Sequence, residues 1–122
     1  MLSLLKVKVE LSRLARDWPI WSRIVAEAAA EILGDCEVYV FGSAVDCQLT
    51  GGSDVDILIV SDRLPEDFRE RCGLKAKIEE KAELPLYHPF ELHLVTHIDV
   101  EANPIYRGAI SGGMPIRTKR VM

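Results

Sequence analysis

Cysteine pairs are missing from this sequence of 122 residues, and their absence argues against a zinc-binding module. The chain has three cysteines, widely spaced and without a Cys-x-x-Cys pair, so a zinc knuckle is not expected. Free thiols buried in a reducing cytoplasm explain them most simply. The three are Cys36, Cys47 and Cys72. Cys47 lies among the motifs described below, where a reactive thiol is the alternative.

Long hydrophobic runs are missing as well. The N-terminal stretch is apolar in places, but charged residues interrupt it at Lys6, Lys8, Glu10 and Arg13. Neither a signal-peptide core nor a membrane span fits between these charges. The sequence therefore predicts a cytoplasmic protein that does not enter a membrane.

An excess of basic residues is the third absence. The chain has 15 basic and 19 acidic residues, which gives a formal net charge of −4. A nucleic-acid-binding domain usually carries a basic patch, whereas the small cluster at Arg117, Lys119 and Arg120 has the form of a solvated chain end. With 48% hydrophobic and 28% charged residues, the composition is typical of a globular protein and argues against disorder.

Apolar residues recur at helical spacing in the first quarter of the chain. The first stripe is Leu4, Val7, Leu11, Leu14 and Trp18, and the second is Trp21, Ile24, Val25, Ala28 and Ile32. Pro19 either breaks the helix or occupies the first turn of the next one, and Gly34 stands where a helix ends. Core packing is the simpler interpretation of both stripes. The alternative is that the first stripe packs against a partner chain.

Strand and helix patterns alternate in the remainder. We expect strands at 37–41, 54–60 and 90–96, a helix at 66–83 and a short helix at 106–110. The longer helix should turn Phe68, Leu74, Ile78 and Ala82 inward. This order predicts an α/β fold with a small mixed β-sheet flanked by helices. We expect one domain over 1–122, with a helical segment at about 3–33 and a catalytic core at about 36–100.

Two aspartates open the strand at 54–60. Because strand side chains alternate, Asp54 and Asp56 point to one face, while Val55 and Ile57 point to the apolar layer. Two adjacent carboxylates repel each other, and a cation relieves that repulsion. Carboxylate oxygens suit hard divalent ions such as Mg²⁺. An ordinary Asx turn is the simpler alternative for Asp54.

A third acidic residue interrupts the strand at 90–96. Glu91 lies between two apolar residues and needs a partner or a function there. If this strand lies beside the strand at 54–60, Glu91 can reach the same metal. A salt bridge to a lysine of the neighbouring helix is the alternative. His93 falls on the same face, where a packed histidine is the simpler interpretation.

A Gly-Ser turn follows the strand at 37–41. Gly42 permits close backbone approach, and the next N–H groups can face an anion. The Ser43 hydroxyl can donate to a phosphate oxygen. Phosphates at this turn and Mg²⁺ at the carboxylates together make a nucleoside triphosphate site.

Gly42-Ser43, ten residues, and then Asp54-Val55-Asp56 resemble the Gly-Ser-x10-Asp-x-Asp motif of the DNA polymerase beta-type nucleotidyltransferase superfamily. The resemblance is greatest to its minimal nucleotidyltransferase branch and covers about 37–96. It implies the polymerase beta-like nucleotidyltransferase fold. It also implies two Mg²⁺ ions, with Mn²⁺ as the alternative, bound by Asp54, Asp56 and Glu91.

Nucleotide binding follows from the same resemblance. It implies that Gly42, Ser43 and Ser53 contact the nucleotide, since Ser53 completes the family's Ser-Asp-x-Asp form. The implied reaction moves a nucleoside monophosphate from an NTP, ATP above all, to a hydroxyl of an acceptor protein or RNA. Members of this branch often accompany a helical HEPN-type partner in a toxin–antitoxin pair.

The acceptor must come from a separate partner or from a dimer, because we expect no room for a further domain. The loop departs from the family at Ala44-Val45-Asp46-Cys47, where many members carry an arginine. The alternative is therefore a weak or inactive nucleotidyltransferase-like module that binds and neutralises a partner protein. A stand-alone nucleic-acid polymerase is disfavoured by the acidic balance.

Overall fold

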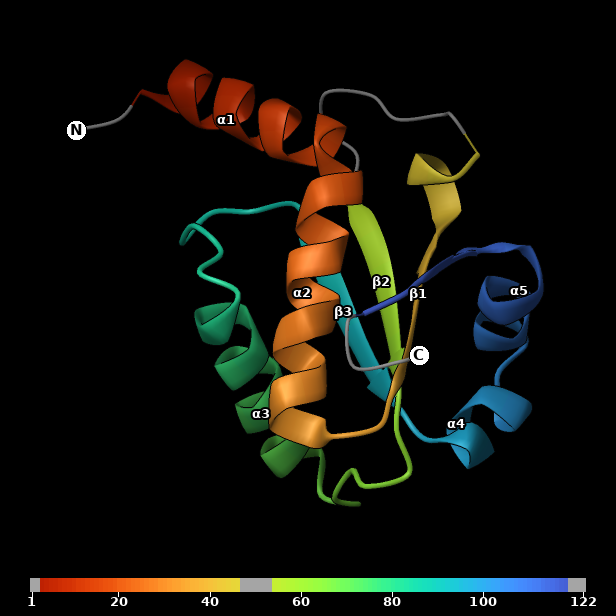
Figure 1. Ribbon diagram of the computed structural model, residues 1–122. Helices are drawn as coiled ribbons and strands as arrows, with labels where there is room; N and C mark the ends of the chain where they lie inside the picture. The colour runs from red at the N-terminus through yellow and green to blue at the C-terminus, as the bar shows by residue number, and fades with distance from the viewer. Residues whose placement is uncertain (1–2, 47–53, 119–122) are drawn as a thin grey trace.

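The structure of the protein is a computed structural model that describes residues 3–46 and 54–118 (Figure 1). The N-terminal helices are α1 (Leu4–Arg16) and α2 (Trp18–Leu33), and the later ones are α3 (Phe68–Lys81), α4 (His97–Ala102) and α5 (Pro104–Gly112). The strands are β1 (Glu37–Phe41), β2 (Val55–Val60), β3 (Phe90–Val95) and β4 (Met114–Ile116). A 3-10 turn, η1 (Gly42–Ala44), follows β1.

The described strands form one mixed sheet in the order β3-β2-β1-β4. β1 is antiparallel to both β2 and β4. β2 and β3 are parallel and are joined by α3, as parallel neighbours require a crossover. The expected mixed sheet flanked by helices is confirmed. The strands that carry Asp56 and Glu91 are neighbours, which was the condition for Glu91 to reach the same metal.

Helices cover both faces of the sheet (Figure 1). α2 and α3 lie on one side, and α4 and α5 lie on the other. Alternation along β2 divides its side chains between the two layers: Val55, Ile57 and Ile59 join the α2 layer, whereas Leu58 and Val60 join the smaller α4–α5 layer. The Asp56 side chain lies on the same face of β2 as Leu58 and Val60. This face therefore carries an acidic side chain beside buried apolar ones.

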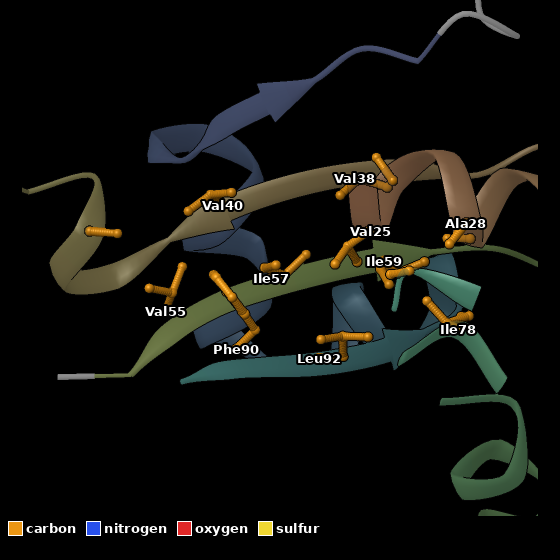
Figure 2. Packing of buried hydrophobic residues seen from close by; sticks show 14 of the residues in the cluster. Val25, Ala28, Val38, Val40, Val55, Ile57, Ile59, Ile78, Phe90 and Leu92 are labelled. Atoms are coloured by element: carbon orange, nitrogen blue, oxygen red, sulfur yellow. The ribbon is translucent and has the colours of Figure 1, made fainter. Parts of the chain in front are cut away.

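The α2 layer forms the larger core. Figure 2 shows its side chains meeting above the sheet: Val25 and Ala28 from α2, Val38 and Val40 from β1, Ile57 and Ile59 from β2, Ile78 from α3, and Phe90 and Leu92 from β3. Small alanine side chains let α2 approach the strands closely. Truncating a fully buried residue such as Ile57 to alanine removes about 2–5 kcal/mol of stability.

Local signals fix the ends of the first two helices. The Ser3 side chain accepts a hydrogen bond from the Lys6 N–H and caps α1. Pro19 lies in the first turn of α2, which decides between the two positions that the sequence allowed. Gly34 ends α2 with a φ angle of 80°.

The sequence prediction was wrong or incomplete at three elements. Phe68 begins α3 but is 79% exposed, so it does not belong to the inner face of that helix. α4 was not predicted, although Thr96 and Asp99 form a reciprocal capping box at its start. β4 was also missed, because its three residues include Pro115, which only an edge strand accommodates.

None of the helices in residues 3–46 and 54–118 is both long and apolar enough to cross a membrane.

Candidate active site

The turn after β1 places a glycine against a carboxylate of β2. Gly42 has a φ angle of 80°, in the left-handed region that favours glycine. A Cβ atom at this position would lie 2.9 Å from Oδ2 of Asp56, closer than side chains normally approach. The register that pairs Phe41 with Asp56 brings the two together. The turn therefore requires glycine for its backbone angle and for this contact.

The two aspartates lie at the start of β2, beside this turn. Asp54 precedes the strand and is exposed, whereas Asp56 lies within it with a side chain that is 32% exposed. Oδ1 of Asp56 lies 3.2 Å from Nε2 of His93 on β3. The Asp56 carboxylate thus has one oxygen against the Gly42 turn and the other against an imidazole.

Glu91 lies on β3 directly beside Asp56. The parallel register pairs the two residues, so they share one face of the sheet. The Glu91 side chain is 53% exposed, and its Oε1 lies 3.9 Å from Nζ of Lys75 on α3. The salt bridge that the sequence allowed is therefore present. Because the pair is long and exposed, it contributes little energy and leaves Glu91 free to exchange partners.

The imidazole of His93 packs against two aromatic rings. Its centroid lies 5.5 Å from that of Phe41 and 5.7 Å from that of Tyr106 on α5. Nδ1 lies 3.4 Å from the Tyr106 hydroxyl oxygen. The sequence placed His93 on the face of Glu91, but its contact with Asp56 depends on the pairing of β2 with β3, which strand alternation does not specify.

The donor set around Asp56 suits a hard divalent cation. The Asp56 and Glu91 carboxylates are partly exposed and come from neighbouring strands, and Asp54 is an exposed residue directly before β2. In residues 3–46 and 54–118, however, no three acidic, histidine or cysteine side chains are already arranged to hold a metal. Glu91 would have to leave Lys75 to join the aspartates. Ser53, expected to bind nucleotide, and Cys47 lie outside the described residues.

Of these three carboxylate residues, Glu91 lines a groove of about 560 Å³. Its floor is β3, including Glu91 and His93, and its walls come from α3 and from α4–α5. Arg71 of α3 donates to Asp99 of α4 at 2.7 Å, and this bond ties the two walls together. Arg71 also donates to the Pro65 carbonyl at 2.6 Å. Hydrogen bonds from the Thr96 N–H and from Arg71 lower the pKa of Asp99.

A second acidic cluster occupies the opposite end of the sheet. His97 places Nδ1 3.0 Å from Asp62 and Nε2 2.8 Å from Glu37. Hydrogen bonds to Asp62, and then to Glu37, raise the pKa of His97, while hydrogen bonds from His97 lower the pKa of Asp62. His97 is the first residue of α4. Beside it, burial raises the pKa of Cys36 to about 11, which keeps that thiol protonated.

Comparison with known proteins defines the class. The model of the nucleotidyltransferase domain family matches residues 22–110. A crystal structure whose nucleotidyltransferase function is itself inferred shares 32% identity and a TM-score of 0.50, covering 64% of this chain and 81% of the other. A second such protein, from Sulfolobus solfataricus, shares 19% identity and a TM-score of 0.48, covering 82% of this chain and 79% of the other. No curated protein matches.

The family match spans well over half of the chain, so the protein belongs to the nucleotidyltransferase domain family. It is a nucleotidyltransferase of the polymerase beta-like superfamily, and the resemblance seen in the Gly-Ser-x10-Asp-x-Asp motif is confirmed at that level. Membership implies an NTP substrate. The roles of individual residues stay predictions.

Proposed function

We propose that the protein transfers a nucleoside monophosphate, with ATP as the preferred donor, to a hydroxyl of a separate acceptor in the cytoplasm. The observation that carries the proposal is the close approach of the Gly42 turn to the Asp56 carboxylate, where an added Cβ would lie 2.9 Å from Oδ2. This approach brings together the two halves of the sequence motif, which are the proposed phosphate-binding turn and the strand that carries Asp56.

Asp54, Asp56 and Glu91 are the proposed ligands of Mg²⁺, with two ions expected and Mn²⁺ as a substitute. Bound there, the cation would neutralise charge on the reacting phosphates. Gly42 and Ser43 would hold the triphosphate, because glycine permits close approach and the serine hydroxyl donates to phosphate oxygen. Ser53 is proposed as a third nucleotide contact.

The chemical step is an in-line displacement. The acceptor oxygen forms a bond to the α-phosphorus while the bond to pyrophosphate breaks, and the proton of the hydroxyl passes to Glu91. Glu91 suits this role because its carboxylate lines the groove while its neighbour in register, Asp56, faces the Gly42 turn. Donor and acceptor would thus approach from opposite sides of the carboxylate group.

The groove between α3 and α4–α5 is the proposed approach path of the acceptor. A partner protein, such as the helical HEPN-type half of a toxin–antitoxin pair, or an RNA would supply the hydroxyl. A second copy of this chain that completes the cleft is the other arrangement. The net charge of −4 favours a protein acceptor, because an RNA carries a negative backbone.

A transfer assay tests this function. The protein is incubated with Mg²⁺, each of four α-labelled NTPs and a candidate acceptor, and covalent label on the acceptor is measured. We expect label from ATP above the other three donors, and its loss when EDTA removes the metal. Equal labelling with and without EDTA would contradict the metal-dependent mechanism.

A protein-binding module with a weak nucleotide site is the second candidate. The observation that favours it is the run Ala44-Val45-Asp46-Cys47, which lacks the arginine that many relatives use on the triphosphate. Calorimetry separates the two candidates. Metal-dependent heat on adding ATP supports the enzyme, whereas heat only on adding the partner protein supports the module.

A further inference from the structure

We propose that His93 is a positioning residue that holds the Asp56 carboxylate in place, with Tyr106 fixing the imidazole from behind. The inference rests on the proposed function, because it concerns how Asp56 is prepared to bind a cation.

The Asp56 carboxylate is held on two sides. The Gly42 turn lies against Oδ2, and His93 Nε2 lies 3.2 Å from Oδ1. The last torsion of an aspartate is broad, so an isolated carboxylate rotates readily. Contacts at both oxygens restrict that rotation. Because the two contacts come from η1 and from β3, the carboxylate is tied to both neighbours of β2.

His93 is itself held by three elements. Its backbone belongs to β3, Phe41 of β1 packs on one side of the ring and Tyr106 of α5 on another. The side chain is only 24% exposed. An imidazole fixed in this way can act as a rigid support, whereas a solvent-exposed lysine or arginine would not.

The two ring nitrogens of His93 face different partners. With the ring hydrogen on Nε2, that N–H donates to Asp56, and the lone pair on Nδ1 can accept from the Tyr106 hydroxyl. The Tyr106 contact, at 3.4 Å, is the weaker of the two. A carboxylate has about four lone-pair positions, so the bond from His93 orients Asp56 and still leaves it free to bind a cation.

Partners that orient a metal ligand typically change metal affinity or activity by about 10–100-fold when they are removed. The test is a direct measurement of Mn²⁺ affinity, from the electron paramagnetic resonance signal of free Mn²⁺, with a non-hydrolysable ATP analogue present. His93→Leu keeps apolar bulk without a donor, and His93→Gln restores an N–H donor near the Nε2 position. The matched control is His97→Leu, at the other end of the sheet.

We expect Asp56→Asn to abolish Mn²⁺ binding and His93→Leu to weaken it about 10–100-fold. His93→Gln should recover most of that loss, Tyr106→Phe should weaken binding by less than His93→Leu, and His97→Leu should leave it unchanged. In transfer assays, His93→Leu should raise the Mg²⁺ concentration needed for half-maximal rate more than it lowers kcat at saturating Mg²⁺.

Three outcomes overturn the inference in distinguishable ways. If His93→Leu binds Mn²⁺ like the wild type while Asp56→Asn does not, His93 has no positioning role and the proposed function stands. If His93→Gln is as weak as His93→Leu, the ring only fills space. If the wild type binds no Mn²⁺ with nucleotide present, the proposed function fails and the inference fails with it. Should His93→Leu not fold, Tyr106→Phe provides the test, and Mn²⁺ affinity equal to that of the wild type would overturn the inference.

Discussion

A histidine–aspartate contact lies near each end of the parallel strands β2 and β3, and the two contacts differ in their surroundings. Near the start of the strands, His93 meets Asp56 among aromatic rings and beside a glycine turn. Just beyond the ends of the strands, His97 lies between Asp62 and Glu37 with its side chain 54% exposed. Both sites contain acidic side chains and a histidine, yet only one has the features of a reaction site.

Hydrogen-bonding capacity accounts for the difference. At the far end, around Asp62, each ring nitrogen of His97 has its own carboxylate partner. A protonated imidazole can therefore donate a hydrogen bond to each of the two carboxylates. At the near end, around Asp56, the His93 imidazole contacts the Asp56 carboxylate, and the Glu91 carboxylate lies 3.9 Å from Lys75. Carboxylates whose negative charge is not fully paired attract a cation. A cluster whose charges are already paired instead links the ends of the strands.

The largest expected contrast is in activity. Asp56→Asn removes a proposed metal ligand, and a loss of about 4 kcal/mol of transition-state stabilisation corresponds to roughly 1000-fold in rate. Asp62→Asn makes the same chemical change one strand length away, and we expect it to transfer nucleotide at close to the wild-type rate. The measurement is labelled nucleotide transfer by both variants. Equal rates would place the reaction elsewhere.

A core substitution should affect both ends together. Ile57 is fully buried in the α2 layer, and Ile57→Ala should lower the free energy of unfolding by about 2–5 kcal/mol. Because β2 carries Asp56 and leads into Asp62, both contacts should weaken in step. Denaturant unfolding measures the loss. A change below about 0.5 kcal/mol, as expected of an exposed position, would contradict the packing in Figure 2.

A glycine substitution should affect only the near end. Gly42→Ala forces a left-handed angle on alanine and pushes a Cβ against Asp56, so we expect a loss of about 1–3 kcal/mol together with loss of activity. Gly73→Ala, in the middle of α3 with open space around it, should instead stabilise by up to about 1 kcal/mol. Thermal unfolding of the two variants shows whether each substitution lowers or raises the stability. A stabilised, active Gly42→Ala would be inconsistent with the turn described.

The smallest expected effect is a pH-dependent change in stability that comes from His97 and Asp62 at the far end. The pKa of His97 is raised in the folded state, so its stabilisation is present below the ordinary value of 6.5 and is lost as pH rises through the folded value. The pKa of Asp62 is lowered, so its contribution is lost only in acid. His97→Asn should therefore lower the melting temperature slightly at pH 6 and not at pH 9. The same difference at both values would exclude an ionic origin.

Much of the fold followed from local signals. The strand at 37–41 was predicted with its observed bounds, and the strands at 54–60 and 90–96 differ from β2 and β3 by one residue at one end. Strand alternation placed Asp56 away from the apolar layer, as observed. These predictions succeeded because each depends on periodicity over a few residues. α4 and β4 were missed, since six and three residues carry too little periodicity to be recognised.

The candidate site needed information that periodicity does not hold. The contact of Asp56 with Gly42 depends on the β1–β2 register, and its contact with His93 depends on the β2–β3 pairing. The sequence offered two partners for Glu91, a cation or a helix lysine, and the structure pairs it with Lys75. Phe68 was wrongly placed inside because a large aromatic residue at helical spacing suggests burial, although it begins α3 at the rim of the groove.

The central claim is that the metal and nucleotide bind at the Gly42 end of the sheet. β2 is about 20 Å long, so the two ends lie far enough apart to be distinguished by paramagnetic broadening. Mn²⁺ with a non-hydrolysable ATP analogue is added to isotope-labelled protein, and backbone amide signals are followed. The account predicts strong broadening at Gly42, Asp56 and Glu91 and little at Asp62 and His97. Broadening centred on Asp62 and His97, or spread evenly over both ends, would contradict it.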